Sequence, residues 1–95
     1  YVTDVARAFL AAAETDLVGR VWNLGAGNPQ SVNRLVELLG GTKIHIPKRP
    51  GEPDVTHANI SRITAELGWR QTVSFEDGVG KIVARIDEQM GLAAA

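Results

Sequence analysis

The prolines between residues 47 and 53 constrain the fold of this chain more than any other feature. They belong to the stretch Pro47-Lys48-Arg49-Pro50-Gly51-Glu52-Pro53. Each proline fixes its own φ and removes a backbone donor, so the stretch is too rigid for a helix and too interrupted for a central strand. The sequence therefore predicts a stiff turn, and this turn carries one arginine and one glutamate, Arg49 and Glu52.

Apolar residues at helical spacing predict two helices before this turn. The first has its apolar stripe between residues 5 and 12, with Thr3 or Asp4 as the expected N-cap. The second has Ser31 as its expected N-cap and ends at Gly40.

Two more helices are expected after the turn. One begins near Asn59 or Ser61, and Gly68 ends it. The last opens at Ser74 and carries an apolar stripe as far as Met90.

Short extended segments are expected between the helices. Residues 21–24 and 43–46 have the composition or alternation of strands, and residues 54–57 add a third short candidate. The two tryptophans, Trp22 and Trp69, are expected in the core. The predicted fold class is therefore α/β, in the sense of a small α+β domain with about four helices and two or three short strands.

Composition excludes several classes of protein. The chain has 95 residues, enough for one domain at most, and its 44% apolar and 22% charged residues make a globular mixture. A net charge of -1 provides no excess of positive charge to attract nucleic acid or an anionic membrane. No apolar run is long enough for a membrane span. No cysteine is present, so a cytoplasmic setting is the default expectation. Because Tyr1 stands inside a patterned segment, we also expect a domain cut from a longer protein.

Other candidate motifs fail on spacing. Gly25 and Gly27 match two glycines of a dinucleotide fingerprint, but the third position is Gln30, so a plain turn is the better interpretation. His45 and His57 have no third ligand at a recognisable spacing, so no metal site is expected. No Ser/His/Asp grouping supports a nucleophilic hydrolase.

Arg49 and Glu52 are the best candidates for a binding site. Arginine offers a planar fork of donors that suits phosphate, and glutamate offers two acceptors that suit a pair of sugar hydroxyls. Together they could bind a nucleotide. They could equally form an ion pair that stiffens the turn, and chemistry alone leaves both interpretations open.

Four segments of the sequence resemble those of a known protein family. They are YVTDVARAFLAAAE, VWNLGAG, RPGEPDVTHANISRITAELGW and SFEDGVGKIV, in this order. Together they resemble the C-terminal part of the extended short-chain dehydrogenases/reductases, specifically the NAD-dependent nucleotide-sugar epimerases and dehydratases. The resemblance implies that residues 1–90 form the C-terminal, substrate-binding part of a Rossmann-type enzyme, followed by a flexible tail at 91–95.

The resemblance also implies roles for the two candidate residues. In that family the arginine of the Arg-x-Gly-Asp/Glu motif contacts the diphosphate of a nucleotide sugar, and the acid contacts the ribose. These roles fall on Arg49 and Glu52, and the expected ligand is a UDP- or dTDP-sugar. The chain departs from the family pattern at Thr3, where an acid is common, and at Asn59, where aspartate is usual.

The sequence lacks the catalytic and cofactor-binding motifs of the family. The Gly-rich cofactor loop and the catalytic Tyr-x-x-x-Lys pair of the family are absent, so we expect no catalytic residue, no cofactor-binding residue and no activity in this chain alone. NAD or NADP would bind to an N-terminal cofactor domain of a parent protein. Two alternatives remain: the corresponding part of a related reductase with a non-nucleotide substrate, and a non-enzymatic module that forms homo-oligomers.

Overall fold

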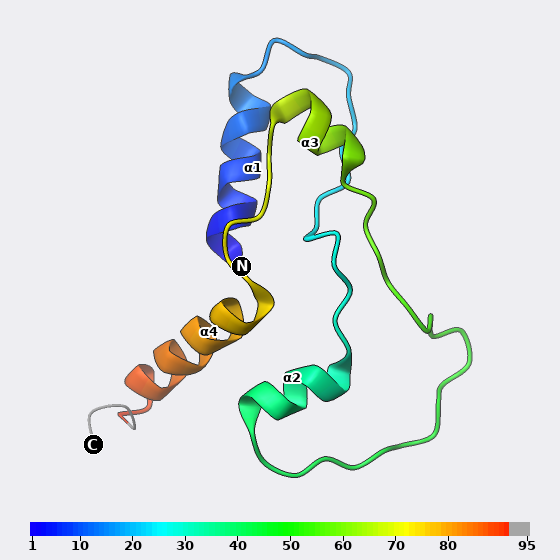
Figure 1. Ribbon diagram of the computed structural model, residues 1–95, viewed down its shortest axis with the longest axis vertical. Helices are drawn as coiled ribbons and strands as arrows, with labels where there is room; N and C mark the ends of the chain where they lie inside the picture. The colour runs from blue at the N-terminus through cyan, green and yellow to red at the C-terminus, as the bar shows by residue number, and fades with distance from the viewer. Residues whose placement is uncertain (92–95) are drawn as a thin grey trace. The chain divides into compact units, whose positions relative to one another are not determined.

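The computed structural model describes residues 1–91, and within them the chain forms four helices and no strand (Figure 1). The helices are α1 (Val2–Glu14), α2 (Val32–Leu39), α3 (Ser61–Leu67) and α4 (Phe75–Gln89). None of these helices is long and apolar enough to cross a membrane. Apart from Gly91, the expected tail at 91–95 lies outside the described residues, and a domain over residues 1–90 stays a prediction.

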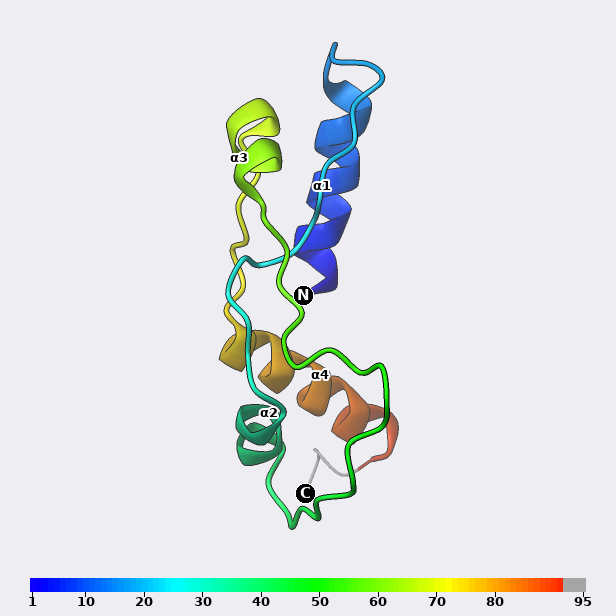
Figure 2. The same cartoon turned by 90° about the vertical axis from the view of Figure 1, so that its right-hand side faces the viewer.

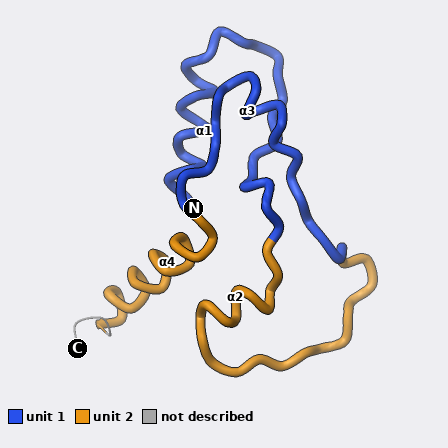
Figure 3. The backbone as a smooth tube through the Cα atoms, viewed as in Figure 1, with its two compact units in different colours: residues 1–29, 53–73 blue, residues 30–52, 74–95 orange. Residues whose placement is uncertain are grey.

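The chain divides into two compact units, and each of them is discontinuous in sequence (Figure 3). Unit 1 combines Tyr1–Pro29 with Pro53–Val73 and contains α1 and α3. Unit 2 combines Gln30–Glu52 with the segment that begins at Ser74 and contains α2 and α4.

The core of unit 1 forms where α1, α3 and the segment after α3 meet. Ala8, Ile63 and Trp69 are buried there, at 3–4% exposure. The partly buried side chains packed against them are Trp22, Leu24, Ile60 and Leu67. Burying one large apolar side chain contributes about 1.5–3 kcal/mol, so Trp69 and Ile63 are the main apolar anchors of this unit. Figures 1 and 2 show α1 and α3 side by side.

Gly68 lets the chain turn back over α3. It has a φ of +65°, in the left-handed region that glycine adopts without steric strain, and its N–H donates to the carbonyl of Thr64. The turn places Trp69 in the core, as the sequence predicts for a tryptophan that follows a helix-ending glycine.

Unit 2 is built on two capped helices that pack against each other. The hydroxyl of Ser31 accepts from the N–H of Arg34, and the hydroxyl of Ser74 accepts from the N–H of Asp77, as the sequence predicts for both N-caps. Arg34 forms ion pairs with Glu37 on its own helix and with Glu76 on α4.

The predicted α/β fold class is wrong for the described residues, because none of the expected strands forms. Residues 21–24 do alternate, with Trp22 and Leu24 toward the core and Val21 exposed at 76%. However, the carbonyl of Val21 accepts from the side chain of Arg62 rather than from another strand. Alternation describes one face of a strand, whereas a strand also needs a backbone partner.

The second expected strand also lacks a sheet to join. Ile44 is 87% exposed and Ile46 is 71% exposed, so the alternation of residues 43–46 leads to no burial within the described part of the chain. The side chain of Lys43 donates instead to the side chain of Asn33, which ties this segment to the first turn of α2. Residues 54–57 likewise have no strand structure.

Candidate functional site

The candidate binding residues lie on a tight turn whose geometry follows from its sequence. The N–H of Glu52 donates to the carbonyl of Arg49 at 3.3 Å, which closes a four-residue turn around Pro50 and Gly51. Gly51 has a φ of +83°. Proline in the second position and a positive-φ glycine in the third are the marks of a type II β-turn. The stiff turn predicted from the prolines is therefore present.

This turn brings the two predicted site residues into contact. Nε of Arg49 donates to Oε1 of Glu52 at 2.6 Å, in a hydrogen-bonded ion pair. The Arg49 side chain is 77% exposed and that of Glu52 is 43% exposed, so water screens the attraction. The structure thus shows the ion pair that chemistry allowed. It leaves both side chains accessible, and their contact with a ligand stays a prediction.

The segment around the turn is open to solvent. Every residue from 40 to 57 is exposed, including Lys48 and His45. A nucleotide could reach the turn without displacing any buried part of the chain.

The two glycines that resemble a phosphate loop have a packing explanation. A Cβ atom on Gly25 would lie 2.9 Å from Cβ of Ala58, closer than such atoms approach each other. Gly27 has a φ of +72°, and its carbonyl accepts a hydrogen bond from Nε2 of His57 at 3.1 Å. Both glycines therefore allow the segments around residues 25 and 58 to approach closely, and the hydrogen bond from His57 links the two segments. The described residues contain no cluster of three potential metal ligands.

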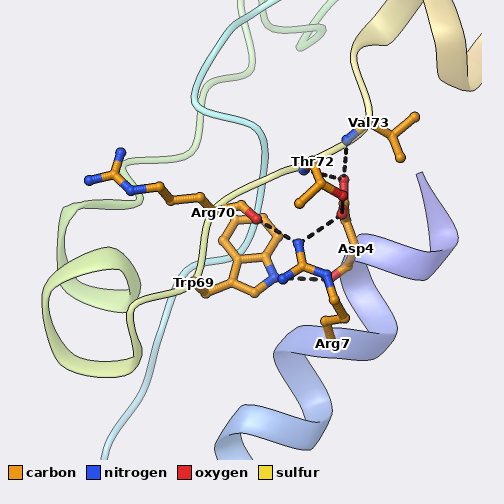
Figure 4. A network of polar contacts seen from close by, with 6 residues as sticks. All are labelled: Asp4, Arg7, Trp69, Arg70, Thr72 and Val73. Carbon is orange, nitrogen blue, oxygen red and sulfur yellow. Dashed lines mark hydrogen bonds and ion pairs between the residues drawn. The ribbon is translucent and has the colours of Figure 1, made fainter.

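A buried carboxylate that the sequence interpretation missed organises unit 1. Figure 4 shows Asp4 on α1 facing the segment that follows Trp69. Asp4 is 3% exposed. Its Oδ1 accepts from the hydroxyl of Thr72 at 2.6 Å and from the guanidinium of Arg7 at 2.9 Å. Its Oδ2 accepts from the N–H groups of Thr72 and Val73, both at 3.0 Å.

These four donors saturate the carboxylate. Two oxygens offer about four lone-pair sites, and all four are occupied. The Thr72 hydroxyl, followed by Arg7 and the backbone of Val73, holds the pKa of Asp4 far below its ordinary value, against the smaller opposing effect of desolvation. Asp4 is therefore an ionised structural clamp, with no capacity left to bind a ligand or to accept a proton near neutral pH.

Neighbouring polar contacts extend the clamp. Nε1 of Trp69 donates to the backbone carbonyl of Asp4 at 2.8 Å, and Arg7 donates to the carbonyl of Arg70 at 2.7 Å. Asp4, Arg7 and Trp69 together fix the segment after α3 against the first turns of α1 (Figure 4). The sequence predicts Asp4 only as a possible N-cap, but α1 begins at Val2 and its N-cap residue is Tyr1.

Glu66 on α3 makes two further polar contacts. The carboxylate of Glu66 accepts from Nε1 of Trp22 at 2.9 Å and from the guanidinium of Arg20. Trp22 therefore packs against the core and satisfies its indole N–H at the same time.

A small cleft in unit 1 lies beside the clamp. Its volume is about 180 Å³, and its lining includes Tyr1, Leu24, Asp4 and Trp69. The Asp4 carboxylate and the indole N–H of Trp69 already have hydrogen-bond partners, so these two polar groups have little capacity left to bind a ligand. The exposed turn with Arg49 and Glu52 remains the better candidate site.

Comparison with known proteins identifies relatives of this chain. Over 93 residues it is 31% identical to the dTDP-4-dehydro-6-deoxyglucose reductase of Escherichia coli, a match that covers 90% of this chain and 29% of the relative. It is 31% identical to UDP-glucuronate 4-epimerase 5 of Arabidopsis thaliana over 103 residues, which covers 87% of this chain and 24% of the relative. It is also 32% identical over 77 residues to the UDP-glucose 4-epimerase of Corynebacterium glutamicum, covering 73% and 23%.

The chain thus spans about a quarter of the length of the curated relatives it matches. No protein-family profile matches it, and no solved structure matches it. The agreement among reductase and epimerase relatives nevertheless points to one group of enzymes. The chain therefore has partial homology, at about 30% identity, to NAD-dependent epimerases and dehydratases.

Proposed function

We propose that this chain is the substrate-binding portion of an NAD(P)-dependent enzyme that acts on nucleotide sugars, of the epimerase or dehydratase type. In this proposal Arg49 binds the diphosphate and Glu52 binds the ribose hydroxyls. The observation that carries it is the exposed type II turn that presents this pair, in a chain whose relatives act on UDP- and dTDP-sugars.

The chemistry of the turn supports these roles. The guanidinium of Arg49 is the only group in the four-residue turn with a full positive charge. Its planar set of N–H donors matches the oxygens of a diphosphate. The carboxylate is an acceptor-only group, which suits hydroxyl donors and repels phosphate. Because the two side chains stand three residues apart on a rigid backbone, a ligand with a diphosphate next to a ribose can meet both.

The proposal assigns the redox chemistry to residues outside this sequence. The homologues are NAD(P)-dependent enzymes, but the 95 residues contain neither a complete G-x-G-x-x-G loop nor a Tyr-x-x-x-Lys pair. The part played by Arg49 and Glu52 is to hold the substrate rather than to transfer a hydride or a proton.

Calorimetric titration with UDP-glucose and dTDP-glucose tests the proposal. We expect Arg49→Ala to weaken binding of both nucleotide sugars about tenfold or more, because a charged hydrogen bond contributes roughly 1.5–3 kcal/mol. We expect Glu52→Ala to weaken binding of nucleotide sugars but not of inorganic pyrophosphate, which has no ribose.

Matched controls lie on the exposed side of α4. Arg85→Ala and Glu88→Ala remove the same charges from unit 2 away from the turn and should leave affinity unchanged. If Arg49→Ala binds like Arg85→Ala, the proposed role of Arg49 is wrong.

A reductase is a second candidate for the reaction class. The E. coli relative, which matches 90% of this chain, is named as a reductase of a dTDP-sugar. A reductase and an epimerase would share the same nucleotide contacts. Turnover assays on a longer protein that contains this segment distinguish them: a reductase consumes reduced cofactor stoichiometrically, whereas an epimerase leaves it unchanged overall.

A further inference from the structure

The contact between Arg49 and Glu52 bears on how their site works. Nε of Arg49 lies 2.6 Å from Oε1 of Glu52, which is the short distance of a charge-assisted hydrogen bond. The carboxylate therefore occupies one edge of the guanidinium. That edge is among those an incoming phosphate would use.

The turn itself keeps the two groups together. Pro50 restricts the backbone between them, and Gly51 takes the positive φ that the type II geometry requires. Neither side chain comes from a distant element, so the pair forms and breaks without moving a helix. An exposed ion pair of this kind changes an equilibrium constant by no more than about fivefold, so a ligand of moderate affinity can displace it.

We propose that Glu52 is an internal occupant of the Arg49 phosphate site. When a nucleotide binds, its diphosphate replaces the carboxylate on the guanidinium, and the released carboxylate accepts hydrogen bonds from the ribose. This inference rests on the proposed function. In addition, the carboxylate of Glu52 competes with any incoming anion for the guanidinium of Arg49. Only a ligand with a ribose gains the released carboxylate as a partner, so the turn discriminates nucleotides from free phosphates.

The exchange predicts that one substitution affects two ligands differently. Glu52→Gln removes the charge of the competitor, so inorganic pyrophosphate should bind about two- to fivefold more tightly to this variant than to the wild type. The same variant should gain less for UDP, or lose affinity, because the ribose loses its carboxylate acceptor. Titrations followed by NMR at constant ionic strength measure both, with the Nε–H signal of Arg49 as a direct reporter of the contact.

A double-mutant cycle separates the ion pair from a general change in charge. The gain for pyrophosphate should vanish when Glu52→Gln is combined with Arg49→Ala, because the competitor acts only through the guanidinium. Glu88→Gln removes an equal charge from α4 and should change pyrophosphate affinity by less than Glu52→Gln.

Each outcome has one meaning. If pyrophosphate and UDP binding do not depend on Arg49, the proposed function is overturned and the exchange with it. If binding depends on Arg49 but Glu52→Gln matches the wild type, the exchange alone is overturned. A gain for pyrophosphate that persists in the double variant also overturns the exchange, because it reports only reduced repulsion.

Discussion

The hydroxyl of Thr72 lies 2.6 Å from Oδ1 of Asp4, although the two residues are 68 positions apart in the sequence. This bond joins the first turn of α1 to the segment that follows α3, and two backbone N–H groups reinforce it at the other carboxylate oxygen. Unit 1 is therefore held by a buried anion as well as by its apolar core.

We expect Asp4→Asn to lower the melting temperature of the chain clearly. The amide group places a donor where the carboxylate accepts from Thr72, Val73 and Arg7, so at least one buried donor loses its acceptor. Thermal unfolding followed by circular dichroism measures the change. Thr3→Ala, at the exposed neighbouring position, is the control, and an Asp4→Asn variant as stable as that control would contradict a structural role for the clamp.

The clamp also predicts a dependence of stability on pH. The pKa of Asp4 is lowered in the folded chain, so its stabilising contribution is complete above the ordinary aspartate pKa of about 3.9 and is lost as pH falls below that value. The difference in unfolding free energy between the wild type and Asp4→Asn should therefore stay constant from pH 7 to about pH 5 and shrink below about pH 4. Urea denaturation at several pH values measures it. A difference that stays constant down to pH 3 would show that the charge of Asp4 does not carry the stabilisation.

Gly25 is expected to tolerate no side chain in the present backbone. Gly25→Ala would place its Cβ 2.9 Å from Cβ of Ala58, and overpacking of this kind lowers the free energy of unfolding by about 1–3 kcal/mol. Chemical denaturation measures the loss. Combining it with Ala58→Gly should restore part of the stability, since the second change removes the colliding atom.

Gly80→Ala is the matched control for Gly25→Ala. Gly80 lies inside α4, and a Cβ there would meet no atom within 4 Å. Alanine favours the helix by up to about 1 kcal/mol, so this substitution should stabilise the chain. Equal effects of the two alanines would show that the contact with Ala58 does not limit position 25.

The two serine N-caps of unit 2 should each contribute separately. Ser31→Ala and Ser74→Ala remove the acceptors of the N–H groups of Arg34 and Asp77 and should each lower the free energy of unfolding by about 0.5–2 kcal/mol. Aspartate at either position keeps an acceptor and should retain most of the stability. Denaturation by urea tests both, and a serine that alanine replaces without loss would not be acting as a cap.

The helices could be predicted from the sequence because their signals are local. Ser31 and Ser74 cap α2 and α4, and Gly40 and Gly68 end α2 and α3 where the sequence places those ends. A cap and a terminating glycine act within one turn of the helix, so neighbouring residues are enough to reveal them.

The strands were predicted wrongly because strand formation depends on a partner. Trp22 and Leu24 show the alternation of a strand, but it arises here from packing on the core of unit 1 without a neighbouring strand in the described residues. The apolar stripe of α1 correctly predicts a helix but not which of its residues are covered: Ala8 is buried, whereas Phe9 is 71% exposed. A periodic pattern shows which side could be buried and cannot show what is available to cover it.

The same difference between local and distant signals applies to the polar sites. The turn at Arg49 and Glu52 could be predicted because Pro50 and Gly51 encode it locally. The clamp at Asp4 could not, because its partners Thr72 and Val73 stand far away in the sequence. The available signal is an acidic residue in the first turn of a helix, and that signal fits an ordinary helix-dipole contact as well.

The discontinuous makeup of unit 1 has a consequence for synthesis on the ribosome. Residues 1–29 are translated before residues 53–73, and they supply only Arg7 as a donor to the Asp4 carboxylate, whereas the other three donors come from Thr72 and Val73. At about 5–20 residues per second, the nascent α1 waits several seconds for them. Until residues 63–69 have been translated, Ala8 has neither Ile63 nor Trp69 to cover it. Assembly of unit 1 is therefore a late event relative to the synthesis of α1, because it requires both parts of the unit to be translated.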